Sequence, residues 1–312
     1  MSSVIVDEVP AAITVTYEPD AGWPERLRAI LNIFPRCIVV DNSVTPEART
    51  FVRATVAGFA TAELIANADN LGLGRALNQG CRALHEGGYR WVVTFDQDSM
   101  PHPGIAAALL DTAAICAQPV AVVGANWQDT SRPGHPSRHL RAGTPFGCGF
   151  RRVVATHDLT DVLCVITSGS LFSLKAWHEL GGFDEALFLD LVDTDFCLRA
   201  RQAGWTVNVS TKARLDHQRG NKHAVPFLGR TYFPAFMPPS RLRGLSRNRL
   251  LLFRRHGTSE PAWVTYELVY AAKLLGDILF LEKQKMAKLA ACFRGTGAGI
   301  FQDSPSADRL KK

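Results

Sequence analysis

The chain has 312 residues, of which 46% are hydrophobic and 21% are charged, and its formal net charge is +6. This composition is that of an ordinary globular protein, with enough apolar residues for one large domain or for one domain with an appendage. The seven cysteines are odd in number and contain no Cys-x-x-Cys pair, which argues against a disulfide framework and against a zinc ribbon.

The charge is unevenly distributed along the chain. Residues 1–216 carry 18 Lys+Arg against 23 Asp+Glu (−5), and residues 217–312 carry 17 against 6 (+11), which sum to +6. We expect the basic C-terminal part to face an anionic partner. Near the N-terminus, Asp7, Glu8 and Pro10 stand where a signal peptide needs basic and apolar segments, so we expect a cytoplasmic protein.

Short apolar strands alternate with helices up to Ala125. The expected strands are Ala11–Tyr17, Cys37–Asp41, 61–66, Trp91–Phe95 and Val120–Ala125. The expected helices lie between them at 23–33, 46–56, 75–85 and 103–117. This alternation predicts an α/β protein with a mostly parallel, doubly wound sheet.

The next part of the chain is less regular. Residues 127–160 are polar and rich in Gly, Pro, Arg and His, and we expect a long functional or mobile loop there. An apolar run at 162–174 is interrupted by Thr167-Ser-Gly-Ser170. It precedes a short helix at 175–180, a second helix ending near Gly204 and a last strand at 205–210.

Beyond residue 220 the sequence becomes basic and helical. We expect a first domain at residues 1–222 and a C-terminal extension at 223–312, with a basic amphipathic helix at 242–255 and one or two more helices at 262–293. The window 262–281 is apolar but contains Glu267, Lys273 and Asp277, which would be costly inside a bilayer. The pattern favours a helix that lies against the body or at the lipid interface, or that forms a homodimer contact.

Two carboxylates, Asp96 and Asp98, end the apolar strand that begins at Trp91. In an extended backbone they would share one face, roughly 7 Å apart, and Pro101 and Pro103 would then stop the strand. Ligands bind at the carboxyl ends of strands in open α/β sheets. Paired carboxylates at that place suit a divalent cation shared with substrate phosphates, although a solvated strand end is the simpler alternative.

Other acids follow strands or open a helix in the same way. Asp41 could accept hydrogen bonds from a base or a ribose, or it could cap a turn. Asp193 would lie in the first turn of a helix, whose positive end keeps a carboxylate ionised and able to deprotonate a hydroxyl. His217, after the last strand, could be a nitrogen ligand of the same metal or a solvated side chain. Gly72-Leu-Gly74 could approach phosphates but lacks the third glycine of a dinucleotide fingerprint.

The order of these motifs resembles the family 2 inverting glycosyltransferases of the GT-A fold. The residues that carry the resemblance are Thr16-Tyr17, Val40-Asp41-Asn42, Asn70-Leu-Gly-Leu-Gly-Arg-Ala-Leu-Asn78, Asp96-Gln-Asp98-Ser99, Thr167-Ser-Gly-Ser170, Gly182-Phe-Asp-Glu185, and Asp193-Thr-Asp195 with Cys197-Leu-Arg199. Asp190-Leu-Val-Asp193, Arg247-Asn248 and Arg294-Gly295 resemble the bacterial rhamnosyltransferase branch in particular.

The resemblance implies a role for each matching residue. Asp98 and His217 would hold Mg²⁺ or Mn²⁺, and Asp193 would be the general base. The nucleotide-sugar would be bound by Thr16, Tyr17, Glu18, Asp41, Asn70, Gly72, Arg75, Asn78, Asp96 and Gln97. The sugar and the acceptor would lie near Ser168, Gly169 and Asp195. Because Val192-Asp193 stands where a Glu-Asp pair is common, Asp190 remains open as an alternative base.

The resemblance therefore predicts a metal-dependent enzyme that moves L-rhamnose from dTDP-L-rhamnose to a saccharide or polyprenyl-linked glycan, peripherally at the inner face of the cell membrane. A UDP-sugar donor stays open, as does a nucleotidyltransferase, although no Gly-rich basic loop follows the first strand. A non-catalytic module that binds a membrane surface through the basic tail is the third alternative. Leu and Phe lie between the basic residues of that tail, a pattern that disfavours nucleic acid as a partner.

Overall fold

The computed structural model describes residues 9–131, 134–143, 147–218 and 223–301. These residues form two compact units. The first runs to Gln128 and includes His135–His139 and Val154–His217, and the second comprises Asp129–Gly134, Leu140–Val153 and the chain from Gln218. Two segments before residue 222 thus belong to the second unit. The predicted domain boundary at that residue stays a prediction.

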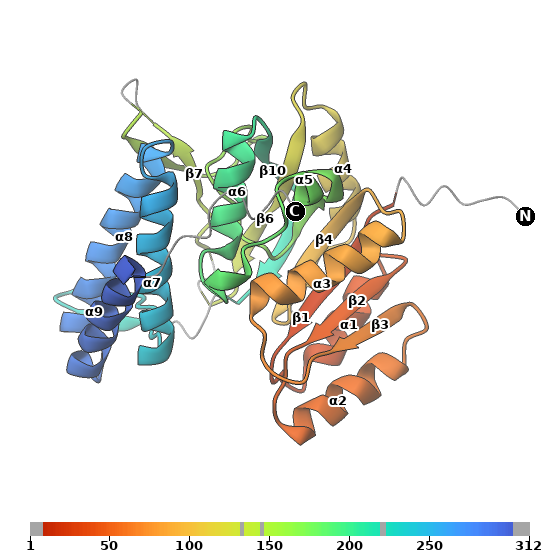
Figure 1. The fold of residues 1–312 in the computed structure, drawn as a ribbon, viewed down its shortest axis with the longest axis horizontal. Helices are drawn as coiled ribbons and strands as arrows, with labels where there is room; N and C mark the ends of the chain where they lie inside the picture. Colours follow the sequence, from red (N-terminus) through yellow and green to blue (C-terminus); the bar gives the residue numbers. More distant parts are fainter. Residues whose placement is uncertain (1–8, 132–133, 144–146, 219–222, 302–312) are drawn as a thin grey trace, which may run out of the picture. The chain divides into compact units, whose positions relative to one another are not determined.

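The first unit is built on an eight-stranded sheet with the order β3-β2-β1-β4-β9-β6-β10-β5 (Figure 1). Its strands are β1 (Ala11–Thr16), β2 (Cys37–Asp41), β3 (Ala62–Ala66), β4 (Trp91–Asp96), β5 (Ser99–Pro101), β6 (Val120–Asp129), β9 (Ser170–Ser173) and β10 (Thr206–His217). Its helices are α1 (Trp23–Leu31), α2 (Pro46–Ala57), α3 (Leu73–Glu86), α4 (Ile105–Ala114), α5 (Leu174–Glu179) and α6 (Val192–Gln202), with a short 3-10 turn at Glu185–Leu187.

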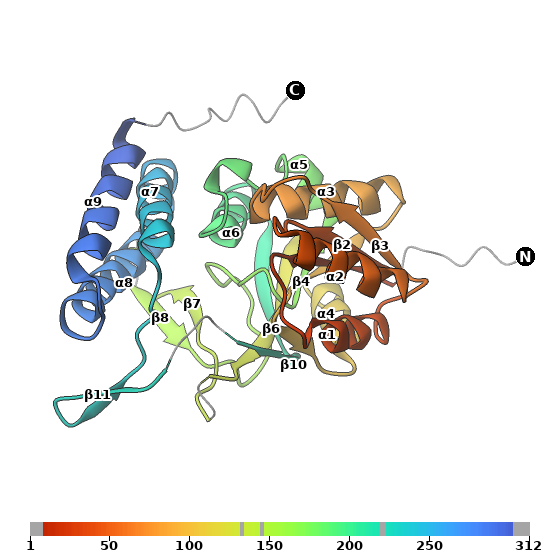
Figure 2. The ribbon, with the colours of Figure 1, turned by 90° about the horizontal axis from the view of Figure 1, so that it is seen from below.

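The predicted α/β class is confirmed, and the sheet is mixed. Strands β3, β2, β1 and β4 are parallel. Strand β9 is antiparallel to both β4 and β6, so β6 again runs in the direction of β4. Helices α1 and α4 lie on one face of the sheet and α3, α5 and α6 on the other (Figure 2). The first face covers an apolar core that includes Trp23, Phe34 and Phe95.

Two sequence expectations about strands were wrong. The stretch 127–160 contains β7 (His139–Ala142) and β8 (Phe150–Val153), which pair in a small sheet of their own. Strand β5, which follows β4 after a turn, ends at Pro101 as expected. The last strand does not stop at residue 210, because β10 continues to His217. Strands β7 and β8 have only four residues each, the lower limit at which an alternation of apolar and polar residues can mark a strand.

Within its described residues, the second unit contains three helices besides its short strands. These helices are α7 (Pro239–His256), α8 (Pro261–Phe280) and α9 (Lys285–Phe301), and a hairpin joins β11 (Val225–Phe227) to β12 (Arg230–Tyr232). Helices α7 and α9 approach closely, because a side chain at Gly299 would collide with the carbonyl oxygen of Arg247. Within the described residues, no helix is both long and apolar enough to cross a bilayer.

The buried side chain of Asn78 on α3 connects this helix by hydrogen bonds to the segment before α6. Its Oδ1 accepts hydrogen bonds from Trp177 Nε1 (3.0 Å) and from the backbone N–H of Phe183 (2.8 Å). Its Nδ2 donates to the carbonyl oxygen of Phe183 (2.9 Å) and to Glu185 Oε1 (3.0 Å). The amide is therefore fully used within the fold and offers no group to a bound nucleotide.

We expect Asn78→Ala to destabilise the protein by about 2–4 kcal/mol, because it leaves a buried indole N–H and a backbone N–H without acceptors. Urea unfolding followed by circular dichroism measures this loss. Arg82→Ala, at an exposed position of the same helix, is the matched control and should change stability by less than about 0.5 kcal/mol. Unchanged stability combined with lost nucleotide binding would instead place Asn78 in the binding site.

Candidate active site

The carboxyl ends of three neighbouring strands meet at one edge of the sheet. In the strand register, Thr16 of β1 pairs with Asp41 of β2, and Val15 pairs with Asp96 of β4. The threonine hydroxyl donates a hydrogen bond to Asp41 Oδ1 at 2.9 Å. The predicted gathering of acids at the carboxyl edge is therefore present for Asp41 and Asp96.

Asp41 is buried and held in one orientation. Besides Thr16, the backbone N–H (3.0 Å) and the hydroxyl (2.7 Å) of Ser43 donate to its Oδ1. Asp41 also borders an open hollow of about 240 Å³. The other lining residues are Arg49, Arg53, Leu64, Ala66, Asn67 and Ala68. A carboxylate fixed at the border of such a hollow can receive the N–H group of a heterocyclic base.

Tyr17 and Glu18 form the loop after β1, and both are tied to neighbouring loops. The side chain of Gln97 accepts a hydrogen bond from the Tyr17 N–H (2.7 Å) and donates one to its carbonyl oxygen (3.1 Å). The Glu18 carboxylate accepts hydrogen bonds at the start of α2, from the backbone of Val44 and from Thr45. The Thr45 hydroxyl, followed by these backbone N–H groups, lowers the pKa of Glu18 below its ordinary value.

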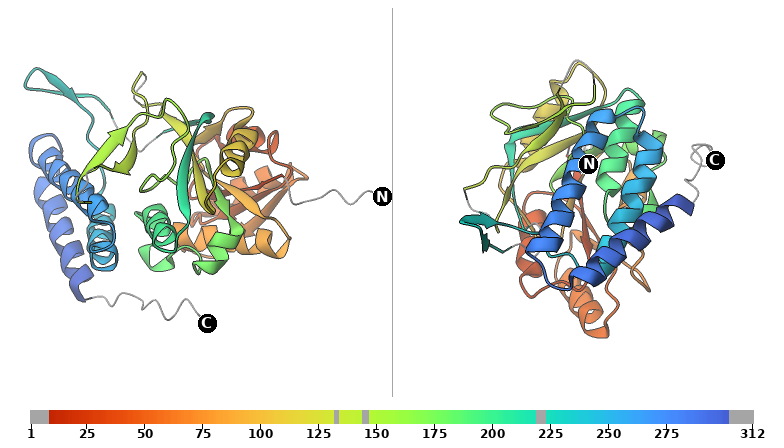
Figure 3. Two further views of the ribbon diagram at one scale, coloured as in Figure 1. Left: turned by 90° about the horizontal axis from the view of Figure 1, so that it is seen from above. Right: turned by 90° about the vertical axis from the view of Figure 1, so that its left-hand side faces the viewer.

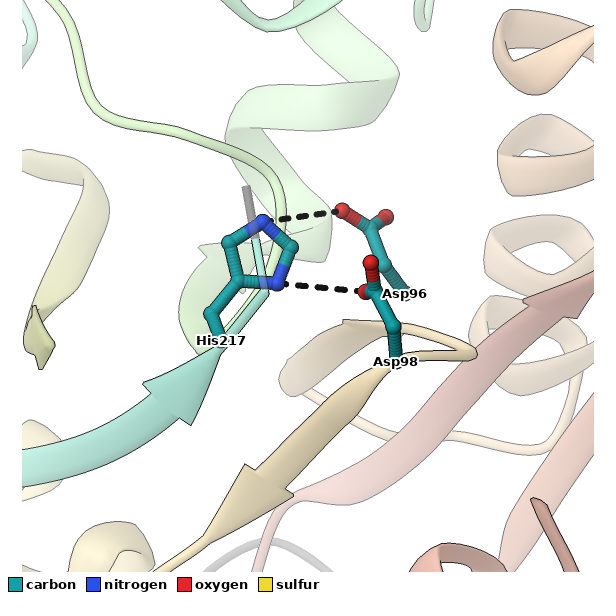
Figure 4. A group of neighbouring side chains, drawn as sticks. All are labelled: Asp96, Asp98 and His217. Atoms are coloured by element: carbon teal, nitrogen blue, oxygen red, sulfur yellow. Dashed lines mark ion pairs between the residues drawn. The ribbon is translucent and has the colours of Figure 1, made fainter. Parts of the chain in front are cut away.

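Asp96, Asp98 and His217 converge on one point (Figure 4). His217 Nδ1 lies 3.2 Å from Asp98 Oδ1, and its Nε2 lies 3.9 Å from Asp96 Oδ2. One ligand atom from each residue lies within 4.8 Å of the others. The imidazole is buried, and both carboxylates are partly exposed. Two carboxylate oxygens and an imidazole nitrogen are a suitable donor set for a divalent cation.

The convergence depends on the turn between β4 and β5. Asp98 lies in this turn, so the extended geometry expected from Asp96 to Asp98 was wrong. Strand β5 then pairs antiparallel with the end of β10, and His217 is the register partner of Ser99. This pairing places the histidine of one strand directly beside the carboxylates that precede the other.

A chain of hydrogen bonds holds the histidine by its Nδ1 atom. Ser99 Oγ lies 2.9 Å from His217 Nδ1 and 2.5 Å from Ser168 Oγ, and the backbone N–H of Asp96 donates to Ser168 Oγ at 3.1 Å. Both serines are fully buried. The relay fixes the imidazole ring with its edge toward the carboxylates, which is the usual function of groups behind a metal-binding histidine.

Asp98 Oδ1 is buried and accepts no hydrogen bond from the described residues, although His217 Nδ1 is 3.2 Å away. The imidazole nitrogen is engaged by Ser99 instead. A buried carboxylate oxygen without a donor is costly unless a cation or a ligand satisfies it. The three residues therefore fit a divalent cation.

Several residues around this group had no predicted role. Trp127 packs its ring edge-on against His217, with the ring centroids 6.5 Å apart. His102, which follows β5, places its Nε2 3.1 Å from Asp216 Oδ2 of β10. Trp127 fell in a stretch expected to be a loop, and neither its type nor its spacing indicated a contact with His217. Ser99 belonged to a recognised motif and could have been found as a neighbour of Asp98.

The loop before α3 packs against protein backbone. Gly72 has φ +84°, and a side chain there would collide with Phe188, whose carbonyl oxygen accepts a hydrogen bond from the Leu73 N–H. Asn70 Oδ1 accepts from the Gly72 N–H at 3.0 Å. Arg75 lies 3.9 Å from Glu185 and is half exposed. The glycine provides close packing of two segments, and the arginine is the group that remains able to reach a phosphate.

The acids around α6 differ in their surroundings. Asp195 is fully buried and paired with Arg199 (2.7 Å), which also donates to the carbonyl oxygens of Leu180 and Gly182. Asp195 thus braces the start of the helix. Asp193 is partly exposed in the first turn of α6 and accepts a hydrogen bond from the Thr194 N–H, and Asp190 precedes the helix, partly exposed. Gly169 (φ +72°) lies where a side chain would collide with Leu215 of β10.

A family model described as "Glycosyltransferase like family 2" matches residues 11–229, which include the triad of Asp96, Asp98 and His217. The chain belongs to this family. It is a glycosyltransferase, as the sequence resemblance implied. The match covers β1 to β11 and leaves α7, α8 and α9 outside it.

Individual relatives agree with this assignment. The glycosyltransferase is 25% identical over 305 residues to the dTDP-rhamnosyl transferase RfbF of Shigella flexneri, covering 93% of this chain and 97% of the relative. Among solved structures it resembles S. aureus TarS 1-349 in complex with UDP-GlcNAc (TM-score 0.57, 14% identity, 96% and 83% covered). It also resembles the mannosyltransferase PcManGT of Pyrobaculum calidifontis in complex with GDP-Man and Mn²⁺ (TM-score 0.54, 15% identity, 95% and 88% covered). These likenesses confirm the GT-A fold.

We expect Ser99→Ala to weaken Mn²⁺ binding by about tenfold, because it removes the hydrogen bond that orients His217. Isothermal titration with Mn²⁺ measures this affinity. Ser210→Ala, which removes another buried hydroxyl from the same unit (Ser210 donates to the carbonyl oxygen of Ala108), should bind Mn²⁺ like the unaltered protein. Equal Mn²⁺ affinity in all three proteins would show that the serine relay does not support a metal ligand.

Proposed function

We propose that the protein is an inverting, divalent-metal-dependent glycosyltransferase that moves L-rhamnose from dTDP-L-rhamnose to a hydroxyl group of a saccharide or lipid-linked glycan. The observation that carries the proposal is the convergence of Asp96, Asp98 and His217 around a buried carboxylate oxygen that accepts no hydrogen bond from the described residues. The 25% identity to a protein described as a dTDP-rhamnosyl transferase supports this choice of donor.

Asp98 and His217 would hold Mg²⁺ or Mn²⁺ at the edge of the sheet, with Asp96 directed at the same point. When bound, the cation would neutralise charge that develops on the diphosphate as the bond to the sugar C1 breaks. Asp41 would receive the base beside the hollow at the end of β2, and the backbone around Tyr17 and Gln97 would border the nucleoside. Ser168 would keep the triad in position below the sugar.

The acceptor hydroxyl would be deprotonated by Asp193. The oxygen of the acceptor hydroxyl would form a bond to C1 of the sugar on the face opposite the diphosphate, and the bond from C1 to the diphosphate would break. The proton of the acceptor hydroxyl would pass to the Asp193 carboxylate, and the anomeric configuration would invert. Asp193 is suited to this role because the N-terminal end of α6 favours its ionised form and its side chain is partly exposed. Asp190 is the alternative, since it lies just before the same helix.

Different donors or partners remain measurable alternatives. Structural neighbours carry UDP-GlcNAc or GDP-Man, so a thermal-shift panel with dTDP-L-rhamnose, UDP-sugars and GDP-mannose in the presence of Mn²⁺ tests the donor directly. Selective stabilisation by a UDP-sugar would replace rhamnose in the proposal. Release of pyrophosphate from a sugar phosphate and a nucleoside triphosphate would indicate a nucleotidyltransferase instead.

We expect Asp98→Asn to lower Mn²⁺-dependent binding of dTDP-L-rhamnose by about tenfold or more, because the substitution removes the charge of the proposed metal ligand. Calorimetric titration of the donor, with and without Mn²⁺, measures this effect. Asp111→Asn, at an exposed carboxylate on α4, is the matched control. Donor affinity that is equally metal-dependent in Asp98→Asn would remove Asp98 from the metal site.

For the base, we expect Asp193→Asn to retain donor affinity and to lower kcat by about 10²–10⁴-fold, since an amide cannot take the acceptor proton. Steady-state kinetics with donor binding measured separately on the same samples will distinguish chemistry from binding. Asp190→Asn is the comparison. If that variant loses turnover and Asp193→Asn does not, the assignments are reversed.

A further inference from the structure

The second unit exposes apolar side chains along two helices. On α9, Met286, Phe293 and Ile300 are separated by seven residues each, close to two helical turns, and therefore lie on one face. Phe293 is 81% exposed, and Phe301 at the end of the same helix is 88% exposed. On α8, Leu268, Leu275, Leu279 and Phe280 are also exposed. A group of large exposed apolar side chains of this kind marks a candidate interaction surface.

Helices α8 and α9 follow each other in the chain and contact each other, and both are drawn in shades of blue in the two views of Figure 3. The hairpin between β11 and β12 adds to the apolar region at one end, because the ring of Phe227 lies 6.3 Å from that of Phe280 and the hairpin tip exposes Leu228. We call the exposed apolar side chains of α8, α9 and this hairpin the α8–α9 surface.

The charges around this surface are of one sign. All four acids between residues 223 and 301, namely Glu260, Glu267, Asp277 and Glu282, are buried. Three of them pair with basic residues: Glu267 with Arg249, Asp277 with Lys273, and Glu282 with Lys288. Lys283, Lys285 and Arg294 remain exposed on or beside α9. The described part of this unit therefore offers solvent only apolar, neutral polar and cationic side chains.

The combination of exposed apolar and cationic side chains fits some binding partners better than others. A second copy of the chain docked on the same surface would oppose cations to cations without an exposed carboxylate to compensate them. A bilayer containing anionic lipid complements both features, because the acyl region accepts Leu and Phe while the headgroups neutralise Lys and Arg. Nucleic acid would satisfy the cations but would leave the aliphatic side chains in water.

We propose that the α8–α9 surface binds the surface of an anionic membrane, with the apolar side chains inserted among the acyl chains and Lys283, Lys285 and Arg294 at the headgroups. Because no described helix can span a bilayer, attachment of this kind would be peripheral. The inference concerns binding alone and does not depend on which sugar the enzyme transfers.

Co-sedimentation of the full chain with vesicles tests the proposal. The vesicles contain phosphatidylcholine alone or about one third phosphatidylglycerol. We expect binding only to the second kind, with weakening at high salt. Phe293→Ser combined with Phe301→Ser should lower the partition coefficient by about tenfold or more. Lys283→Gln, Lys285→Gln and Arg294→Gln together should lower it by about a hundredfold.

The matched controls lie in the first unit, where Ile115 is 74% exposed and Arg82 is also exposed. Ile115→Ser and Arg82→Gln should bind vesicles like the unaltered protein, and all variants should retain the same circular dichroism spectrum and donor affinity. Absence of vesicle binding, or equal loss in the controls, would overturn the proposal. So would a dimer, seen by analytical ultracentrifugation, that the Phe293 and Phe301 variants abolish, or binding to a DNA duplex in place of vesicles.

Discussion

The antiparallel pairing of β5 with the end of β10 is the constraint on which the site depends. It makes His217 the neighbour of Ser99, just after a turn that carries Asp98 and follows Asp96. A shift of the register by one residue would direct the histidine to the opposite face of the sheet. The acids alone follow from the end of one strand, but the third ligand requires that two strands far apart in the sequence keep this pairing.

Electrostatics explains why such an arrangement needs a cation. Two carboxylates directed at one point repel each other, and one buried oxygen of Asp98 accepts no hydrogen bond from the part of the chain that the structure describes. The serine relay holds His217 by the nitrogen that faces Asp98, so the ring is positioned by neutral hydroxyls and not by the acids themselves. A divalent ion shared with a diphosphate would relieve the repulsion and satisfy the buried oxygen at once.

Local sequence patterns predicted the regular half of the fold well. Strands such as Cys37–Asp41 and Trp91–Asp96 are apolar runs that end on acids, so their positions and the acids at their carboxyl ends could be read directly. Local patterns could not predict strand β5, the extension of β10 or the contact of Trp127 with His217, because these features arise from pairing between distant segments. Asn78 and Asp195 were predicted to lie at a ligand; in the structure both are buried, Asn78 bonds to Trp177 and Phe183, and Asp195 pairs with Arg199, which are contacts that local patterns do not reveal. The family resemblance supplied His217, which spacing alone left undecided.

The central claim is that Asp98 and His217 share one cation with the donor diphosphate. Anomalous scattering from crystals grown with Mn²⁺ and dTDP tests it most directly. The account predicts a manganese peak bonded to Asp98, to His217 and to diphosphate oxygens at the edge of the sheet. A manganese peak elsewhere, or a diphosphate bound in this place with no peak beside these two residues, would contradict it.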